Sequence, residues 1–144
     1  MKRFFLITLI IINIISCKKE VIELTNPDKD IPEFVGNWSR VYDILGSDFT
    51  ATYEIDTNLI HYTNKGNGPG NADYVIYFDS YDEVDKRWIG HTDKNKYYLL
   101  FFKNITAESI SIYKQKVNNP NDAQSIAIPA DDNDKNYGWN TYSK

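Results

Sequence analysis

The feature that most constrains this chain of 144 residues is a strict two-residue alternation of apolar and polar side chains. In residues 49–55, apolar side chains fall at every second position, and polar ones lie between them. Residues 72–79 and 109–112 show the same period. A period of two places alternate side chains on opposite faces of a β-strand. Aromatic residues, which strands favour, make up 15% of the chain. The pattern predicts an all-β domain from Phe34 onward.

Seven stretches have this strand pattern, separated by turn-forming Gly, Asn and Asp residues. They cover residues 36–45, 49–55, 58–63, 72–79, 84–91, 96–103 and 106–115. Their short connections predict an antiparallel meander. So many strand edges predict closure into an up-and-down barrel or a sandwich. Residues 137–142 are expected to form a closing strand or a docked tail. In the run from Tyr97 to Phe102, odd and even positions are all apolar, which predicts a strand covered on both faces.

One short helix is expected near the C-terminus. Asn119 is a good N-cap, Pro120 suits the first helical position and Pro129 stops the element. The expected helix covers residues 120–127.

The first seventeen residues have the composition of an export signal. Lys2 and Arg3 precede a mostly apolar run over residues 4–15, which is too short to span a bilayer. The run ends in Ile14-Ile15-Ser16-Cys17, which resembles the lipobox of bacterial lipoproteins. The resemblance implies cleavage before Cys17, acylation of this cysteine, palmitate being a typical chain, and membrane attachment through the lipid. The expected divisions are a signal peptide over 1–16, a lipidated cysteine and tether over 17–33, and a β domain over 34–144.

The resemblance also implies a location. Lys18 follows the cysteine, where an Asp would favour the inner membrane, so the lipoprotein resemblance favours the outer membrane. The charged stretch after Cys17 resembles the start of Bacteroidetes lipoproteins, which leaves both the periplasmic face and the cell surface open. Within the tether, residues 21–24 have a second interpretation as the start of a strand.

A second resemblance begins at Gly36-Asn37-Trp38. A Gly-x-Trp at the start of the first strand is similar to the lipocalin signature, and Thr92-Asp93 resembles a later turn of that family. The order of strands followed by a helix also fits small lipocalin-like lipoproteins of Bacteroidetes. The resemblance implies an eight-stranded barrel whose first-strand tryptophan packs across the closed end.

A barrel of this size holds either its own side chains or one small ligand. The aromatic residues expected to face inward are Trp38, Tyr53, Tyr74, Phe78 and Trp88. They form a solid core in one interpretation. In the other they line an aromatic pocket and contact a small apolar or planar ligand.

Several kinds of chemistry lack a motif in this sequence. There is no Gly-x-Ser-x-Gly and no free cysteine in the expected mature chain, so no enzyme activity and no cofactor are predicted. His61 and His91 lie thirty residues apart, a spacing that does not specify a metal site. The acidic turns at 79–85 and 131–134 do not match an EF-hand, and the glycine-rich segment 64–71 does not match a phosphate-binding loop. A net charge of −4 and a pI near 5.1 exclude a typical nucleic-acid partner.

Two functions fit these features. The first is a non-catalytic, lipid-anchored module that binds a small apolar or aromatic ligand or an envelope component. The alternative is a protein-binding lipoprotein, such as an inhibitor or immunity factor against an envelope-acting enzyme or toxin. Loss of Lys2 and Arg3 with the signal peptide gives a mature charge of −6, which complements a basic partner. Segments 64–71 and 79–85 are the expected contact loops.

Overall fold

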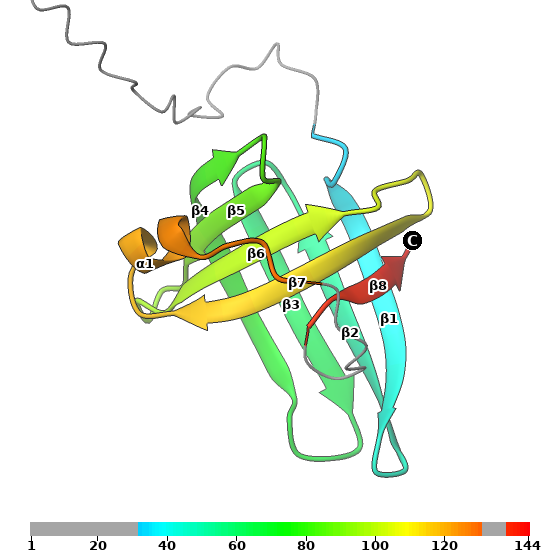
Figure 1. Cartoon of the computed structure of the whole chain (residues 1–144). Coiled ribbons are helices and arrows are strands. Elements are labelled where there is room, and N and C mark those ends of the chain that lie inside the picture. The colour runs from blue at the N-terminus through cyan, green and yellow to red at the C-terminus, as the bar shows by residue number, and fades with distance from the viewer. Residues whose placement is uncertain (1–31, 131–137) are drawn as a thin grey trace, which may run out of the picture.

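The structure, a computed structural model, describes residues 32–130 and 138–144. Its described part contains eight strands and one helix. The strands are β1 (Gly36–Ile44), β2 (Ser47–Ile55), β3 (Leu59–Gly66), β4 (Ala72–Asp82), β5 (Arg87–His91), β6 (Tyr97–Lys103), β7 (Ser109–Val117) and β8 (Asn140–Ser143). Each strand pairs antiparallel with the next, and β8 pairs with β1 to close a barrel (Figure 1).

The architecture confirms the expected all-β fold and decides for the barrel over the sandwich. The closing strand expected within 137–142 is β8, which begins at Asn140. The other strands lie close to their expected positions, but β3 and β4 are longer than predicted. β3 continues to Gly66 because Asn64 pairs with Ala72 and Gly66 pairs with Phe49 across the sheet. β4 continues to Asp82 through a bulge between Phe78 and Ser80. Such a bulge restores pairing after one unmatched residue.

The two ends of the barrel differ in their connections. The chain enters β1 at the end where the β4–β5 turn also lies, whereas the β1–β2 turn and the β3–β4 connection lie at the opposite end (Figure 1). We call these the entry end and the far end. The interior of the entry end is a dense apolar core. Its fully or almost fully buried members include Phe34, Trp38, Ile60, Ile76, Trp88, Leu100, Phe102 and Ile110.

Trp38 is the centre of this packed end. Its side chain is fully buried, and its ring nitrogen donates a hydrogen bond of 2.8 Å to the carbonyl oxygen of Phe34. Phe34 in turn stacks on Phe102, with ring centroids 4.6 Å apart and planes inclined by 8°. The segment that leads into the barrel is therefore fixed across its end by one indole ring.

A glycine makes room for a second indole. A Cβ atom on Gly90 of β5 would lie 2.3 Å from the Trp88 ring and 2.2 Å from the carbonyl oxygen of Tyr77. The first distance lies far below van der Waals contact, and the second involves backbone that cannot move aside cheaply. Any larger residue at this position would clash with the fully buried Trp88 ring, which lies against the backbone of Gly90 on the same strand.

The helix α1 (Pro120–Ser125) covers the outer face of β5, β6 and β7. Asn119 is its N-cap, and the Asn119 side chain accepts a hydrogen bond from the backbone nitrogen of Asp122. Beneath it lies a second apolar cluster made of Ile89, Leu99, Phe101, Val117 and Ala123. β6 is therefore covered on both faces, as its sequence predicts.

The helix is two residues shorter than the predicted 120–127. Arg87 on β5 explains the difference, because its guanidinium donates to the carbonyl oxygens of Gln124 and Ile126 at 2.5 and 2.9 Å. These carbonyls are satisfied by the barrel wall, and Ile126 is extended with a ψ of 124°. Among the described residues, no helix has the length and apolarity needed to cross a membrane. The expected signal peptide 1–16, Cys17, the tether up to residue 31 and the acidic turn 131–134 lie outside the described residues.

We expect Trp38→Ala to lower the free energy of unfolding by about 3–5 kcal/mol, because it removes a large buried ring and leaves a cavity. Trp38→Phe should cost less, since it keeps an aromatic ring and loses the hydrogen bond to Phe34. Urea unfolding followed by tryptophan fluorescence or circular dichroism measures both. An alanine variant with the wild-type midpoint would contradict this role for Trp38.

Candidate functional site

The inward-facing residues change character halfway along the barrel. On β7, the inward series runs Ile110, Ile112 and Lys114 from the entry end toward the far end. On β3 it runs Ile60, Tyr62 and Asn64. The entry half of the lumen is filled by apolar side chains, whereas tyrosines and polar groups line the far half.

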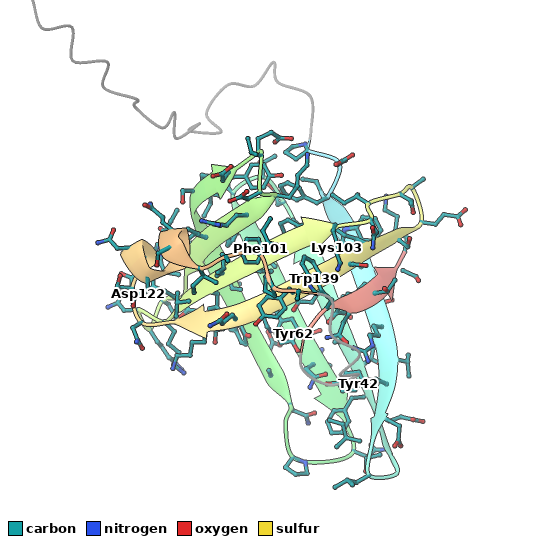
Figure 2. All side chains as sticks on the ribbon, viewed as in Figure 1. Tyr42, Tyr62, Phe101, Lys103, Asp122 and Trp139 are labelled. Carbon is teal, nitrogen blue, oxygen red and sulfur yellow. The ribbon has the colours of Figure 1, made fainter. Side chains whose placement is uncertain are left out.

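A cavity of about 310 Å³ lies in this far half, and we call it the tyrosine cavity. Its lining comes from five strands and from Gly138, which lies just before β8. The lining residues are Arg40, Tyr42, Ala51, Tyr53, Tyr62, Ile112, Tyr113, Lys114, Gly138, Asn140 and Tyr142. Figure 2 shows Tyr62 near the middle of the barrel and Tyr42 nearer the β1–β2 turn. The described lining includes two basic side chains and no acidic one.

Lys114 is the central polar group of this cavity. Its Nζ lies 3.0 Å from the ring centroid of Tyr62 and donates a hydrogen bond of 2.9 Å to the hydroxyl of Tyr74. The ring centroids of Tyr53, Tyr74 and Tyr98 lie 5.4, 5.3 and 6.0 Å from the same nitrogen. The amine therefore sits among four aromatic rings, and its described surroundings provide no carboxylate partner.

Burial lowers the pKa of Lys114 from its ordinary value of 10.5 to about 7. Desolvation acts in this direction because it penalises the ammonium form relative to the neutral amine. The negative faces of the surrounding rings act in the opposite direction and favour the ammonium. Near neutral pH, Lys114 therefore exchanges between its charged and neutral forms with little free energy difference.

The tyrosines around Lys114 remain neutral phenols at physiological pH. Burial raises the pKa of Tyr53, Tyr62 and Tyr74 above their ordinary value of 10. The pKa of Tyr142 is also raised by burial, although Arg40 acts against the shift. These hydroxyls are hydrogen-bond donors and acceptors without a negative charge, so they do not neutralise the lysine.

A second hollow lies near the cavity. Tyr74 of β4 and Tyr98 of β6 stack with centroids 5.3 Å apart and planes inclined by 19°. Both rings line a groove of about 460 Å³ that runs between the start of β4 and the β5–β6 turn. Its lining mixes acidic and basic side chains, including Asp73, Asp93 and Lys96, and is more exposed than the tyrosine cavity. The groove is larger, but its charges are balanced and solvated, so we regard the tyrosine cavity as the site.

The far end of the barrel is covered by the segment that resembled a glycine-rich loop. The ring of Phe49 lies against Gly66 and Gly68, where added Cβ atoms would lie 2.5 and 3.2 Å from ring carbons. Asn64, which is buried, accepts a hydrogen bond from the Tyr42 hydroxyl and donates one to the carbonyl oxygen of Gly70, both 3.0 Å long. The glycines therefore serve to pack the loop on Phe49.

The barrel wall is thinnest between β1 and β7. β8 pairs with β7 from Ser109 to Ile112, but with β1 it forms the single pair Ser39–Ser143. Further toward the far end, β1 and β7 face each other across this gap, and among the described strands neither has a hydrogen-bonded neighbour on the edge that faces the other. Arg40 lies at this point, where it donates to the side-chain oxygen of Asn140 and lies over the Tyr42 ring. The tyrosine cavity reaches the barrel surface here, since the outward-facing Tyr113 is part of its lining.

The five residues predicted to face the lumen do so, in two groups. Trp38, Phe78 and Trp88 belong to the packed entry half, where Phe78 contacts Trp88 edge to face. Tyr53 lines the tyrosine cavity, and Tyr74 contacts its lysine. The prediction missed Lys114 and Tyr62. The parity of β7, in which Lys114 follows Ile110 and Ile112, would have indicated an inward lysine.

The two histidines lie apart on the outer surface. His61 bridges two carboxylates, with Nδ1 3.1 Å from Glu54 and Nε2 2.8 Å from Asp73. Asp73 and then Glu54 raise its pKa above 6.5. His91 contacts Asp79 at 2.7 Å. Within residues 32–130 and 138–144, no group of three or more His, Cys, Asp or Glu side chains is arranged to hold a metal ion.

The loops expected to contact a protein partner are partly in the sheet. Residues 64–66 lie in β3 and residues 79–82 in β4. In the turn that follows, Asp82 accepts from the backbone nitrogen of Val84, and Asp85 pairs with Arg87. These acids stabilise the turn locally, and the protein-binding interpretation stays a prediction.

The comparisons with known proteins do not assign a family. No protein-family profile, curated protein or solved structure matches this chain significantly. The site is therefore interpreted from its own geometry.

We expect Lys114 to give the barrel a measurable pH dependence. Between about pH 7 and 10.5 the unfolded chain holds a proton on this amine that the folded barrel releases, so the free energy of unfolding rises with pH. The slope approaches about 1.4 kcal/mol per pH unit. Urea unfolding at several values from about pH 7 to 9, below the titration of the tyrosines, measures it.

Lys114→Met should remove this slope, whereas Lys116→Met, an exposed lysine on the same strand, should keep it. Equal slopes in wild type and Lys114→Met would show that the amine keeps its ordinary pKa in the folded protein.

Proposed function

We propose that this protein is a lipid-anchored envelope protein whose barrel binds a small, flat aromatic or apolar ligand in the tyrosine cavity. The observation that carries the proposal is the cavity itself, a volume of about 310 Å³ lined by five tyrosines in the far half of a closed barrel and open to the surface between β1 and β7. Small-molecule sites are concave, and this volume lies at the lower end of their range.

The ring geometry supports a flat ligand. Tyr53 meets Tyr62 at a centroid distance of 4.8 Å and an inclination of 51°, and it meets Tyr142 edge-on at 5.0 Å and 88°. The rings present both faces and edges to the cavity, and aromatic groups interact favourably with both. The packed entry half below gives these tyrosines a rigid base, which keeps the ordering cost of binding low.

The proposed anchor and the cavity lie toward opposite ends of the barrel. The chain joins the barrel at the entry end, beside Phe34 and Trp38, and the tyrosine cavity lies in the other half. A lipid on Cys17 would hold the packed end nearest the tether and leave the thin wall between β1 and β7 accessible. The lipobox resemblance supports this arrangement, and the lipocalin resemblance of Gly36-Asn37-Trp38 supports a binding role.

We expect Ala51→Leu to weaken binding of 2-naphthamide, a neutral flat probe, by at least about tenfold, because Ala51 is buried and lines the cavity. Thr52→Leu is the matched control, since the neighbouring side chain points out of the barrel. Titration followed by tyrosine and tryptophan fluorescence measures the affinity. Absence of binding by the wild type, or equal binding by Ala51→Leu, would contradict a ligand in this cavity.

We expect Cys17→Ala to abolish incorporation of labelled fatty acid and to release the protein from the membrane fraction, because the acyl chains provide the membrane affinity. Lys19→Ala, two residues further along the tether, should retain both. A Cys17→Ala protein that still sediments with membranes would exclude anchoring by lipidation.

A further inference from the structure

The most unusual group in the molecule is the amine of Lys114. An ammonium has three hydrogen-bond donors. One of them is used by the hydroxyl of Tyr74, and the ring face of Tyr62 lies opposite the nitrogen. Within the described chain no further hydrogen-bond acceptor and no carboxylate contacts this nitrogen. A buried charge is stable only when it is paired and fully hydrogen-bonded, and among the described residues Lys114 has no partner of opposite charge.

Two other basic side chains of the described barrel have such partners. Arg87 is held by Asp85 and by two carbonyl oxygens at the end of α1. Lys86 pairs with Glu83 and Glu33. Lys114 lines the cavity together with Arg40, which donates to the side-chain oxygen of Asn140. An anion of a size that the cavity admits would give Lys114 a partner of the kind that Arg87 and Lys86 have.

We propose that the natural ligand of the tyrosine cavity is a small aromatic acid, whose carboxylate pairs with Lys114 while its ring lies among Tyr53, Tyr62 and Tyr142. This inference rests on the proposed function and adds the chemical class of the ligand. A carboxylate accepts the two amine donors that remain and can accept further bonds from neutral phenols.

The charges that face Lys114 from the other strands allow this pairing. Arg40 of β1 is the second cation of the lining, and the groups from β2, β3, β4, β6 and β8 are the hydroxyls of Tyr53, Tyr62, Tyr74, Tyr98 and Tyr142. Burial raises the pKa of Tyr53, Tyr62, Tyr74 and Tyr142, so these four are neutral near pH 7. A carboxylate that enters the cavity meets no described acid in the lining, whereas the nearby groove combines Asp73 and Asp93 with two lysines.

Binding is then coupled to protonation of the lysine. In the free barrel the amine loses its proton near pH 7, and a bound carboxylate favours the ammonium. The affinity for an aromatic acid should therefore be constant below about pH 6 and should fall by up to about tenfold per pH unit above pH 7. The affinity for a neutral analogue of the same shape should not follow this profile.

The test compares 2-naphthoate with 2-naphthamide, which has the same ring system and no charge, and with the cationic 2-naphthamidine. Isothermal titration calorimetry at pH 6 measures all three on the wild-type protein. A charge-assisted hydrogen bond predicts that naphthoate binds at least about tenfold more tightly than naphthamide, and that naphthamidine binds most weakly. This comparison needs no variant and so does not depend on how a mutant folds.

Two variants locate the effect. Lys114→Met should reduce naphthoate binding to the level of naphthamide and remove the pH profile, whereas Lys116→Met should change neither. Equal binding of naphthoate and naphthamide by the wild type would overturn the acid specificity and leave the ligand cavity in place. Absence of binding by both would overturn the proposed function as well.

Discussion

A single buried amine organises the inside of this barrel. Placing Lys114 on the inward face of β7 puts an ionisable group where the neighbouring positions, Ile110 and Ile112, belong to a dry core. Apolar side chains cannot solvate an ammonium. At the level of Lys114 along the barrel axis, the inward-facing residues of the neighbouring strands are therefore tyrosines, in place of the isoleucine and tryptophan of the packed half. Tyrosine provides both a ring face and a hydroxyl to the amine, and it stays neutral because burial raises its pKa. This change from isoleucine and tryptophan to tyrosine divides the lumen into a packed half and a hollow half.

The packed half makes the hollow half possible. An isolated ring of tyrosines would collapse into its own cavity, because rings gain contact by approaching one another. Here the strands are held at fixed spacing from below by Trp38 and Trp88 and from outside by α1, which Arg87 ties to β5. The far end is held by Phe49 against the glycines of the β3–β4 connection. Because β8 pairs with β1 at a single residue pair, strand edges are left beside the cavity at this point of the described barrel.

Alternation in the sequence was sufficient to predict an antiparallel all-β domain, but it left a barrel and a sandwich as alternatives. The strands, the doubly covered β6 and the cap of α1 at Asn119 all follow from local residue patterns. The extension of β4 past Asp79 was not predictable, because the bulge depends on how Phe78 and Ser80 pair with β5 across the sheet. The role of residues 66–70 was also missed. Segment 64–71 was expected to be a contact loop, whereas Gly66 and Gly68 pack closely on Phe49, which lies seventeen or more residues earlier in the sequence.

The site was only half predictable for a related reason. The expected lumen residues were chosen for aromatic character, which identifies Tyr53 and Tyr74 but does not separate them from Trp38, Phe78 and Trp88 in the solid core. What distinguishes the two groups is the height of each residue along the barrel, and this depends on strand register and shear. Lys114 was overlooked because charged residues in strands usually face water. Its inward position follows from the parity of β7, in which it continues the inward series of Ile110 and Ile112.

The most direct test of this account is a crystal structure of the protein with 2-naphthoate. The account predicts a naphthalene ring in the cavity, in contact with Tyr53, Tyr62 and Tyr142, with a carboxylate oxygen within hydrogen-bonding distance, about 3 Å, of the Lys114 amine. A lumen filled by its own tyrosines, or a naphthoate bound only in the groove beside Asp73 and Lys96, would contradict it.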